Sequence, residues 1–204
     1  VVKRAVEHFG RLDVVVNNAG YGLFGAVEEL DERAVRDQME TNFFGTLWVT
    51  QAALPYLRAQ GSGHIVQISS AAGVLAFPTM GGYHASKWAV EGLSESLAQE
   101  VAGFGVKVTL VEPGGYATDW AGNSAVHAES NSAYGELREA VASVPVRQGD
   151  PAAAGAALLE IVDTEEPPLR VFFGSQPLET VRFCYAERIK VWEMWAGLSA
   201  AAEG

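Results

Sequence analysis

The sequence contains a single cysteine, Cys184, among its 204 residues. One cysteine allows no disulfide within the chain, and no cysteine–histidine cluster has the spacing of zinc ligands, so we expect no metal site. We expect Cys184 to be a small apolar residue in the fold, between Phe183 and Tyr185.

Basic residues are also scarce, with 14 Lys and Arg against 25 Asp and Glu, for a net charge of −11. This balance argues against a nucleic-acid partner and against an anionic membrane surface. No apolar run approaches the roughly 18 residues of a membrane span. The first nine residues mix charged and apolar side chains as an amphipathic helix does, not as a signal peptide does. We therefore expect a cytoplasmic protein that acts on a small molecule.

Helical and strand patterns alternate along the chain with short links between them. This order predicts βαβ units, an α/β fold with a parallel sheet, and one domain over residues 1–204. The connection at 115–149 is too long for a plain link, so we expect a substrate loop there. The predicted helices are 1–9, 28–60, 81–103, 132–142, 151–163 and 177–197, and the predicted strands are 12–16, 64–69, 106–112 and 169–173.

Tyr83 and Lys87 lie four residues apart in a predicted helix, so both side chains face the same way. A nearby ammonium favours the phenolate and would bring the tyrosine pKa, ordinarily about 10, toward the working range of an acid–base catalyst. Alone, this spacing is weak, and a solvated helix surface explains it as well.

Polar residues follow three predicted strands, where open parallel sheets place their active sites. Ser70 can donate a hydrogen bond to a carbonyl oxygen, and glycine and proline at 113–118 let the backbone approach a ligand. Asn42 stands inside a predicted helix, where asparagine has a poor propensity. Taken singly, these residues also fit strand caps, turns and surface positions.

Taken together, five motifs occur in one order: Asn-Asn-Ala-Gly at 17–20, Thr-Asn-Phe-Phe-Gly at 41–45, Ile-Ser-Ser at 68–70, Tyr-x-x-x-Lys at 83–87 and Pro-Gly-x-x-x-Thr at 113–118. This set resembles the short-chain dehydrogenase/reductase family over essentially the whole chain. The loop 113–120 and the C-terminal half look like the branch that is similar to 17β-hydroxysteroid and retinol dehydrogenases.

The resemblance implies hydride transfer between NAD or NADP and a secondary alcohol or carbonyl. Tyr83 would be the general acid/base, Lys87 would lower the tyrosine pKa and bind the nicotinamide ribose, Ser70 would polarise the carbonyl, and Asn42 would hold a water that relays the proton. The cofactor-binding residues that the resemblance implies are Asn17, Ala19, Gly20, Tyr83, Lys87, Pro113, Gly114 and Thr118.

The sequence departs from the family pattern before Asn17, because no glycine-rich turn follows a strand there. The resemblance therefore predicts a Rossmann-type doubly wound sheet that lacks its first βαβαβ portion, roughly 70 residues. The strand at 12–16 would then have an unpaired edge. We expect the chain alone to be unstable or unable to hold a dinucleotide. The choice between NAD and NADP would lie in the absent portion.

An apolar substrate site is expected, and its candidate residues are Tyr21, Leu75, Phe77, Tyr116 and Trp120. Such a lining favours a hydrophobic alcohol or ketone, such as a steroid-, retinoid- or polyketide-like molecule. Trp192 and Trp195 are interpreted as core or interface residues. By the resemblance, the helices at 28–60 and 81–103 would pair with a second subunit in a homodimer or homotetramer.

Two other functions remain open at this point. One is an epimerase or dehydratase of the extended family that uses the same tyrosine and lysine. The other is a partial chain without activity of its own, acting as a regulatory or binding module.

Overall fold

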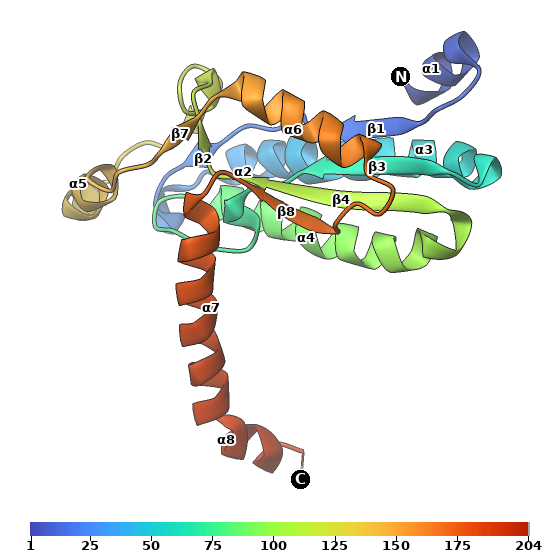
Figure 1. Cartoon of the computed structure of the whole chain (residues 1–204). Helices are drawn as coiled ribbons and strands as arrows, with labels where there is room; N and C mark the ends of the chain where they lie inside the picture. Colours follow the sequence, from blue (N-terminus) through green and yellow to red (C-terminus); the bar gives the residue numbers. More distant parts are fainter. Residues whose placement is uncertain (204) are drawn as a thin grey trace.

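A four-stranded parallel sheet forms the centre of the molecule (Figure 1). The computed structural model describes residues 1–203. The strands are β1 (Val14–Asn17), β3 (Gly63–Ile68), β4 (Val106–Pro113) and β8 (Arg170–Phe173), in the order β1-β3-β4-β8. The predicted α/β class with a parallel sheet is confirmed.

The register of the sheet brings the carboxyl ends of its strands to one edge. Asn17 pairs with Gln67, Ile68 with Val111, and Pro113 with Phe173. The polar segments that follow β1, β3 and β4 therefore begin side by side, as expected for the active-site edge of a parallel sheet.

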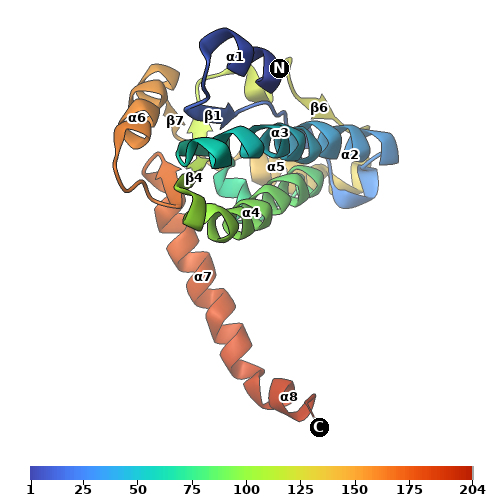
Figure 2. The same ribbon diagram turned by 90° about the vertical axis from the view of Figure 1, so that its right-hand side faces the viewer.

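Helices cover both faces of this sheet. On one face, α3 (Gly45–Gln60) and α4 (Gly81–Val101) lie side by side and close a core around Leu57 and Ile65, both fully buried (Figure 2). On the other face, α6 (Pro151–Asp163) packs one side over the sheet, through Ala154, Ala157, Leu158, Ile161 and Val162 (Figure 1). The α6 helix begins as its sequence predicts, because the Asp150 side chain accepts a hydrogen bond from Ala152 N.

The prediction of one continuous helix at 28–60 was wrong. The structure divides this stretch into a 3₁₀ turn (Val27–Glu29), α2 (Glu32–Met39), one π-helical turn (Glu40–Phe44) and α3. Asp31 separates the first two, because its carboxylate caps α2 and keeps its own backbone extended. Periodicity alone does not reveal a one-residue bulge such as the π turn.

The connection at 115–149 folds back over the active-site edge as small structured pieces. β5 (Gly115–Tyr116) pairs with β7 (Gln148–Gly149), and β6 (Val126–His127) pairs with β2 (Leu23–Phe24). The predicted short helix at 132–142 is present as a 3₁₀ turn and a helix. The 3₁₀ turn is Ser132–Tyr134 and the helix is α5 (Gly135–Ala142). Elsewhere in the chain, 3₁₀ turns also occur at Ala71–Gly73, Ala102–Phe104 and Asp119–Ala121.

The two ends of the chain lie at the margins of the molecule. α1 (Val2–Phe9) ends at Gly10, in the left-handed conformation (φ 77°) that its predicted C-cap role requires. β1 has one neighbour in the described sheet, β3, so its other edge is unpaired, as expected.

At the other end, α7 (Gln176–Met194) and α8 (Ala196–Ala201) project away from the sheet (Figures 1 and 2). Trp192 and Trp195 lie on this projection with 64% and 57% of their surface exposed. Of the two interpretations, that of core residues is therefore wrong for this chain, and that of interface residues stays a prediction. Cys184 is half-buried nearer the start of α7. None of the helices described here is both long and apolar enough to cross a membrane.

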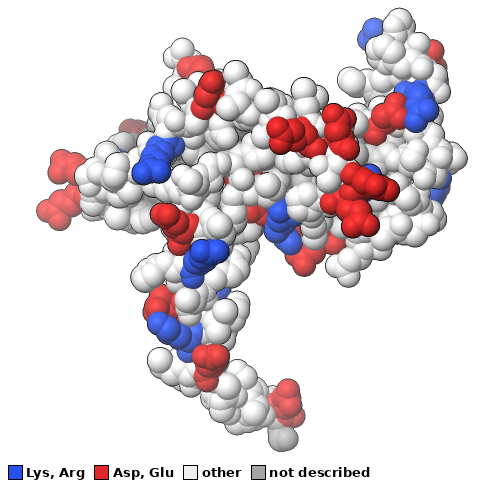
Figure 3. Space-filling view, viewed as in Figure 1, with Lys and Arg blue, Asp and Glu red and all other residues white. Residues whose placement is uncertain are grey.

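The charges are scattered over the face shown in Figure 3. Basic side chains occur there singly or in small groups between acidic ones, without a continuous basic surface. This distribution agrees with the net charge of −11.

Candidate active site

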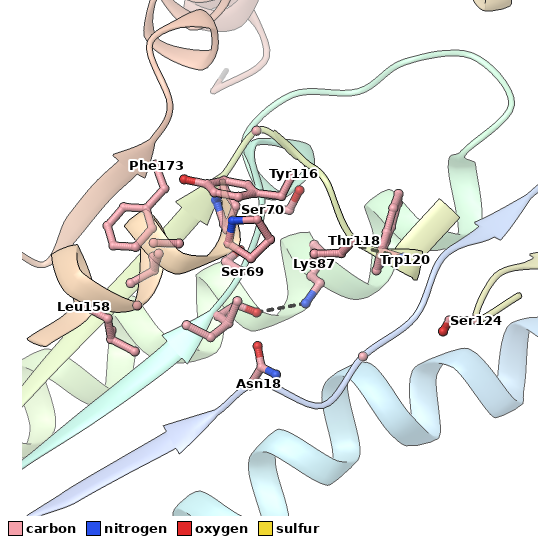
Figure 4. Close-up of a pocket in the computed structure, with 18 of the residues that line it drawn as sticks. Asn18, Ser69, Ser70, Lys87, Tyr116, Thr118, Trp120, Ser124, Leu158 and Phe173 are labelled. Atoms are coloured by element: carbon pink, nitrogen blue, oxygen red, sulfur yellow. Dashed lines mark hydrogen bonds between the residues drawn. The ribbon is translucent and has the colours of Figure 1, made fainter. Parts of the chain in front are cut away.

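A cavity of about 540 Å³ opens where the carboxyl ends of the strands meet. Its walls come from the segments after β1, β3 and β4, from α4 and α6, and from the loop after β5 (Figure 4). The lining residues are Asn18, Gly20, Ile68, Ser69, Ser70, Tyr83, Lys87, Val111, Pro113, Gly114, Tyr116, Thr118, Asp119, Trp120, Ser124, Pro151, Ala154, Gly155, Leu158 and Phe173.

Tyr83 lies in the first turns of α4 and is 4% exposed. Burial raises the pKa of Tyr83 to about 12, and a hydrogen bond with the Ser70 side chain opposes this rise. The ring of Trp120 packs edge-on against the ring of Tyr83, with 4.9 Å between centroids. The predicted lowering of the Tyr83 pKa by Lys87 is therefore not found in this structure, because burial raises that pKa instead. The hydroxyl is a neutral phenol at pH 7, beside Ser70 and covered by the ring of Trp120.

Lys87 extends from the next turn of α4 toward the same cavity (Figure 4). Its Nζ donates to the backbone oxygen of Ile68 at 2.9 Å and lies 5.9 Å from the centroid of the Tyr83 ring. Burial lowers the pKa of Lys87 to about 8, against the opposing charge of Glu91. At pH 7 most of this side chain is still an ammonium. Because it has three N–H donors and one protein acceptor, it can bind further oxygens.

Asn42 lies in the π-helical turn and is 1% exposed. Its Oδ1 accepts from Tyr21 N at 3.1 Å, and its Nδ2 donates to Tyr21 O at 3.1 Å and to Ser86 Oγ at 3.0 Å. It therefore fastens the segment after β1 to α4, one residue from Lys87. The π turn rotates Asn42 inward, which explains an asparagine inside a helical stretch.

The structure brings most of the predicted cofactor residues to the cavity, but not all. Gly20, Pro113, Gly114 and Thr118 line it with Tyr83 and Lys87, whereas Asn17 and Ala19 are not among the lining residues. The Asn17 side chain instead donates to Thr50 Oγ1 and Gln67 Oε1 at 3.1 and 2.7 Å, which ties β1 to α3 and β3.

The predicted substrate residues separate into two groups. Tyr116 and Trp120 line the cavity, but Tyr21, Leu75 and Phe77 do not. Leu75 is 2% exposed within the core, and Phe77 is 41% exposed, with its backbone N–H bound to His84 Nε2. The apolar character of Leu75 reflects burial and that of Phe77 reflects packing on His84. In neither case does it show which side of the loop faces the cavity.

Several lining residues were missed by the sequence reasoning. Ser69, Ser124 and Phe173 line the cavity, as does the part of α6 from Pro151 to Leu158. Ser69 had a signal, its place at the end of a strand. The α6 residues had none, because alanine, glycine and leucine at these positions are equally expected of a helix that only covers a sheet.

Comparison with known proteins decides the family. A family model described as short chain dehydrogenase matches residues 1–128. The chain belongs to the short-chain dehydrogenase family. The oxidoreductase BOA17 of Botryotinia fuckeliana is 40% identical over 206 residues, covering 98% of this chain and 75% of that protein. The 3-ketodihydrosphingosine reductase of Bacteroides thetaiotaomicron is 43% identical over 192 residues, covering 89% of this chain and 71% of that protein.

Solved structures of the family agree with the fold. A short-chain dehydrogenase from Streptomyces avermitilis superposes with a TM-score of 0.88 at 40% identity, covering 98% of this chain and 74% of that one. One from Burkholderia cenocepacia, solved with NADP, gives a TM-score of 0.73 at 27% identity, covering 95% and 72%. The resemblance to short-chain dehydrogenases is confirmed, and the protein is a member of an oxidoreductase family.

Proposed function

We propose that the protein transfers a hydride between NAD or NADP and a hydrophobic ketone or secondary alcohol. The observation that carries this proposal is the convergence of Ser70, Tyr83 and Lys87 on one cavity, with the ammonium of Lys87 one helical turn from the phenol of Tyr83. We further propose that residues 1–204 form a single, partial nucleotide-binding domain in which the segment 115–149 covers the substrate.

The lining residues fit the nicotinamide end of such a cofactor. Lys87 has N–H donors beyond the one that Ile68 accepts, and ribose hydroxyls are suitable acceptors for them. Gly20 keeps this space open, because a Cβ there would lie 3.1 Å from Asn42 Oδ1 and 3.5 Å from Lys87 Nζ. Pro113, Gly114 and Thr118 would contact the nicotinamide. The relative of known structure that was solved with NADP supports a cofactor of this class.

When bound, the nicotinamide supplies or accepts the hydride. The residues of this chain place the carbonyl and move the proton. The Ser70 hydroxyl donates a hydrogen bond to the carbonyl oxygen and polarises it. The neutral Tyr83 hydroxyl gives its proton to the same oxygen as negative charge develops there. The Lys87 ammonium stabilises the phenolate that remains, and Asn42 would hold the water through which the proton is restored.

The cavity walls favour an apolar substrate. Trp120, Tyr116, Leu158 and Phe173 give the cavity a largely apolar and aromatic lining, Trp120 packs against the Tyr83 ring, and a few hydroxyls supply the polar contacts. Phe24 and His127, from β2 and β6, hold Trp120 in place: Phe24 packs edge-on against Trp120 and stacks on His127. The relative named 3-ketodihydrosphingosine reductase, whose substrate is a ketone by its name, supports this class.

The test is reduction of a graded series of ketones, followed by the absorbance of NADH or NADPH. We expect turnover that falls by about 100-fold or more in Tyr83→Phe, because general acid catalysis contributes that much. The matched control is Tyr185→Phe, whose side chain lies on α7 outside the cavity. Equal rates for the two variants would contradict the proposal.

A further inference from the structure

Besides Tyr83 and Lys87, another ionisable side chain lies beneath the active site and has no part in the mechanism above. Glu91 follows Lys87 by one turn on α4 and is 5% exposed. Gly73 makes room for it, because a Cβ at Gly73 would come within 2.6 Å of Ser69 Oγ and 2.9 Å of Glu91 Cγ. Glu91 is therefore packed directly under the strand end that carries Ser69 and Ser70.

An arginine from the edge strand holds this carboxylate. Arg170 Nε, at the start of β8, donates to Glu91 Oε2 at 3.1 Å. The same guanidinium binds Glu95 Oε2 at 2.8 Å and lies 3.5 Å from Glu112 Oε1 on β4. The position of Glu91 is thus fixed from α4, β4 and β8 together, and not by its own helix alone.

The charged groups around Glu91 are Lys87 and Glu95 on α4, Glu112 on β4 and Arg170 on β8. Burial raises the pKa of Glu91, and Ser69, Arg170 and Lys87 oppose that rise. Burial and the neighbouring Glu91 raise the pKa of Glu112 to about 7. Of the three carboxylates near Arg170, Glu91 is the one that lies one helical turn from Lys87 on α4, and both side chains are 5% exposed.

We propose that Glu91 is a positioning residue of the Tyr83–Lys87 pair: its carboxylate, held by Arg170 one turn from Lys87 on α4, supplies the buried Lys87 ammonium with an opposite charge. The inference rests on the proposed function only for the role of Lys87, which is to stabilise the Tyr83 phenolate. The electrostatic claim stands on geometry: Glu91 and Lys87 lie four residues apart on α4, both are 5% exposed, and Arg170 fixes the carboxylate.

The physical reason is the cost of burying a cation. Lys87 is 5% exposed, and its only hydrogen-bond acceptor among the described residues is the neutral carbonyl of Ile68. A carbonyl dipole alone compensates poorly for lost solvation. A carboxylate one turn away supplies the missing opposite charge. Without it, more Lys87 would be neutral at working pH and would no longer stabilise a phenolate.

The test substitutes Glu91→Gln, which keeps the shape and an oxygen for Arg170 but removes the charge. The matched control is Glu95→Gln, which lies one turn further on, binds the same guanidinium and is 55% exposed. The readout is NMR of ¹³C-labelled lysine as a function of pH. The chain has four lysines, Lys3, Lys87, Lys107 and Lys190, so Lys87→Arg assigns the signal.

We expect the titration midpoint of Lys87 to fall by about one pH unit in Glu91→Gln and by less than about 0.3 in Glu95→Gln. An unchanged midpoint in a folded Glu91→Gln would overturn the proposal. If that variant does not fold, Glu91→Asp decides, because it keeps the charge but withdraws it by one methylene. We then expect a smaller fall, and no fall would overturn the proposal.

This readout needs neither cofactor nor substrate. A failure of the protein to reduce ketones while Lys87 still responds to Glu91 would therefore refute the proposed function and leave the role of Glu91 intact. The opposite pattern, full activity with no response of Lys87, would refute the role of Glu91 alone.

Discussion

Replacing Asn42 with alanine tests how the active-site edge is held together. Asn42 makes three hydrogen bonds, two to the backbone of Tyr21 and one to Ser86 Oγ. Two of the partners keep another bond, because Tyr21 O also accepts from Gln38 and Ser86 Oγ also donates to Tyr83 O. Only the Tyr21 N–H loses its sole partner.

The cost follows from this count. A buried donor without a partner costs about 1–3 kcal/mol, and each of the other two bonds contributes about 0.5–1.5 kcal/mol. Because the sites share one side chain, these values do not add fully. We therefore expect Asn42→Ala to lower the free energy of unfolding by about 2–4 kcal/mol. Asn42→Asp should also destabilise, since it turns an acceptor toward the carbonyl of Tyr21.

Urea unfolding followed by tryptophan fluorescence measures this change. The control is Asn123→Ala, an exposed asparagine outside the cavity lining, which should change stability by less than about 0.5 kcal/mol. A loss below about 1 kcal/mol for Asn42→Ala would refute the view that this side chain fastens the β1 end to α4.

Three further predictions concern the scaffold. Gly105→Ala should lower the free energy of unfolding in urea by about 2 kcal/mol or more, because Gly105 has φ +69° and a Cβ there would strike a backbone carbonyl. The control Gly103→Ala places its Cβ in open space and should lower it by less than half as much. Leu57→Ala should cost about 2–5 kcal/mol because Leu57 is fully buried, and Leu159→Ala, at 65% exposure, less than about 1 kcal/mol; similar losses would contradict the assigned core. Because the folded pKa of Glu112 is raised from 4.5 to about 7, its stabilising effect is complete below 4.5 and is lost as pH rises toward 7; Glu112→Gln should flatten this fall in stability, and an unchanged slope would argue against the shift.

Much of the fold was predictable from local pattern. The strand at 106–112 and the helix at 151–163 carry their own signals, a β-branched run ended by proline and an Asp-Pro start, and the structure places them within a residue of the prediction. Tyr83 and Lys87 were predictable because helical spacing fixes their common face.

The rest depends on tertiary contacts that no local pattern records. The π turn that directs Asn42 inward is an insertion of one residue into a helix. The pairing of β2 with β6 joins residues 23–24 to 126–127, and it brings Trp120 over Tyr83. No local pattern distinguishes Glu91 from other charged residues of a helix, because its partner Arg170 lies 79 residues further along the chain.

The most direct test of the central claim is the binding of NADPH and NADH, measured by fluorescence of the reduced nicotinamide. The measurement compares the native protein with Lys87→Met and, as control, Lys107→Met, which lies near the start of β4, away from the cavity. We predict that the affinity for the reduced cofactor falls by about 10-fold or more in Lys87→Met and stays unchanged in Lys107→Met, since charged hydrogen bonds contribute about 1.5–3 kcal/mol. Binding that is equal in all three proteins, or absent from the native one, would contradict the proposed cofactor site.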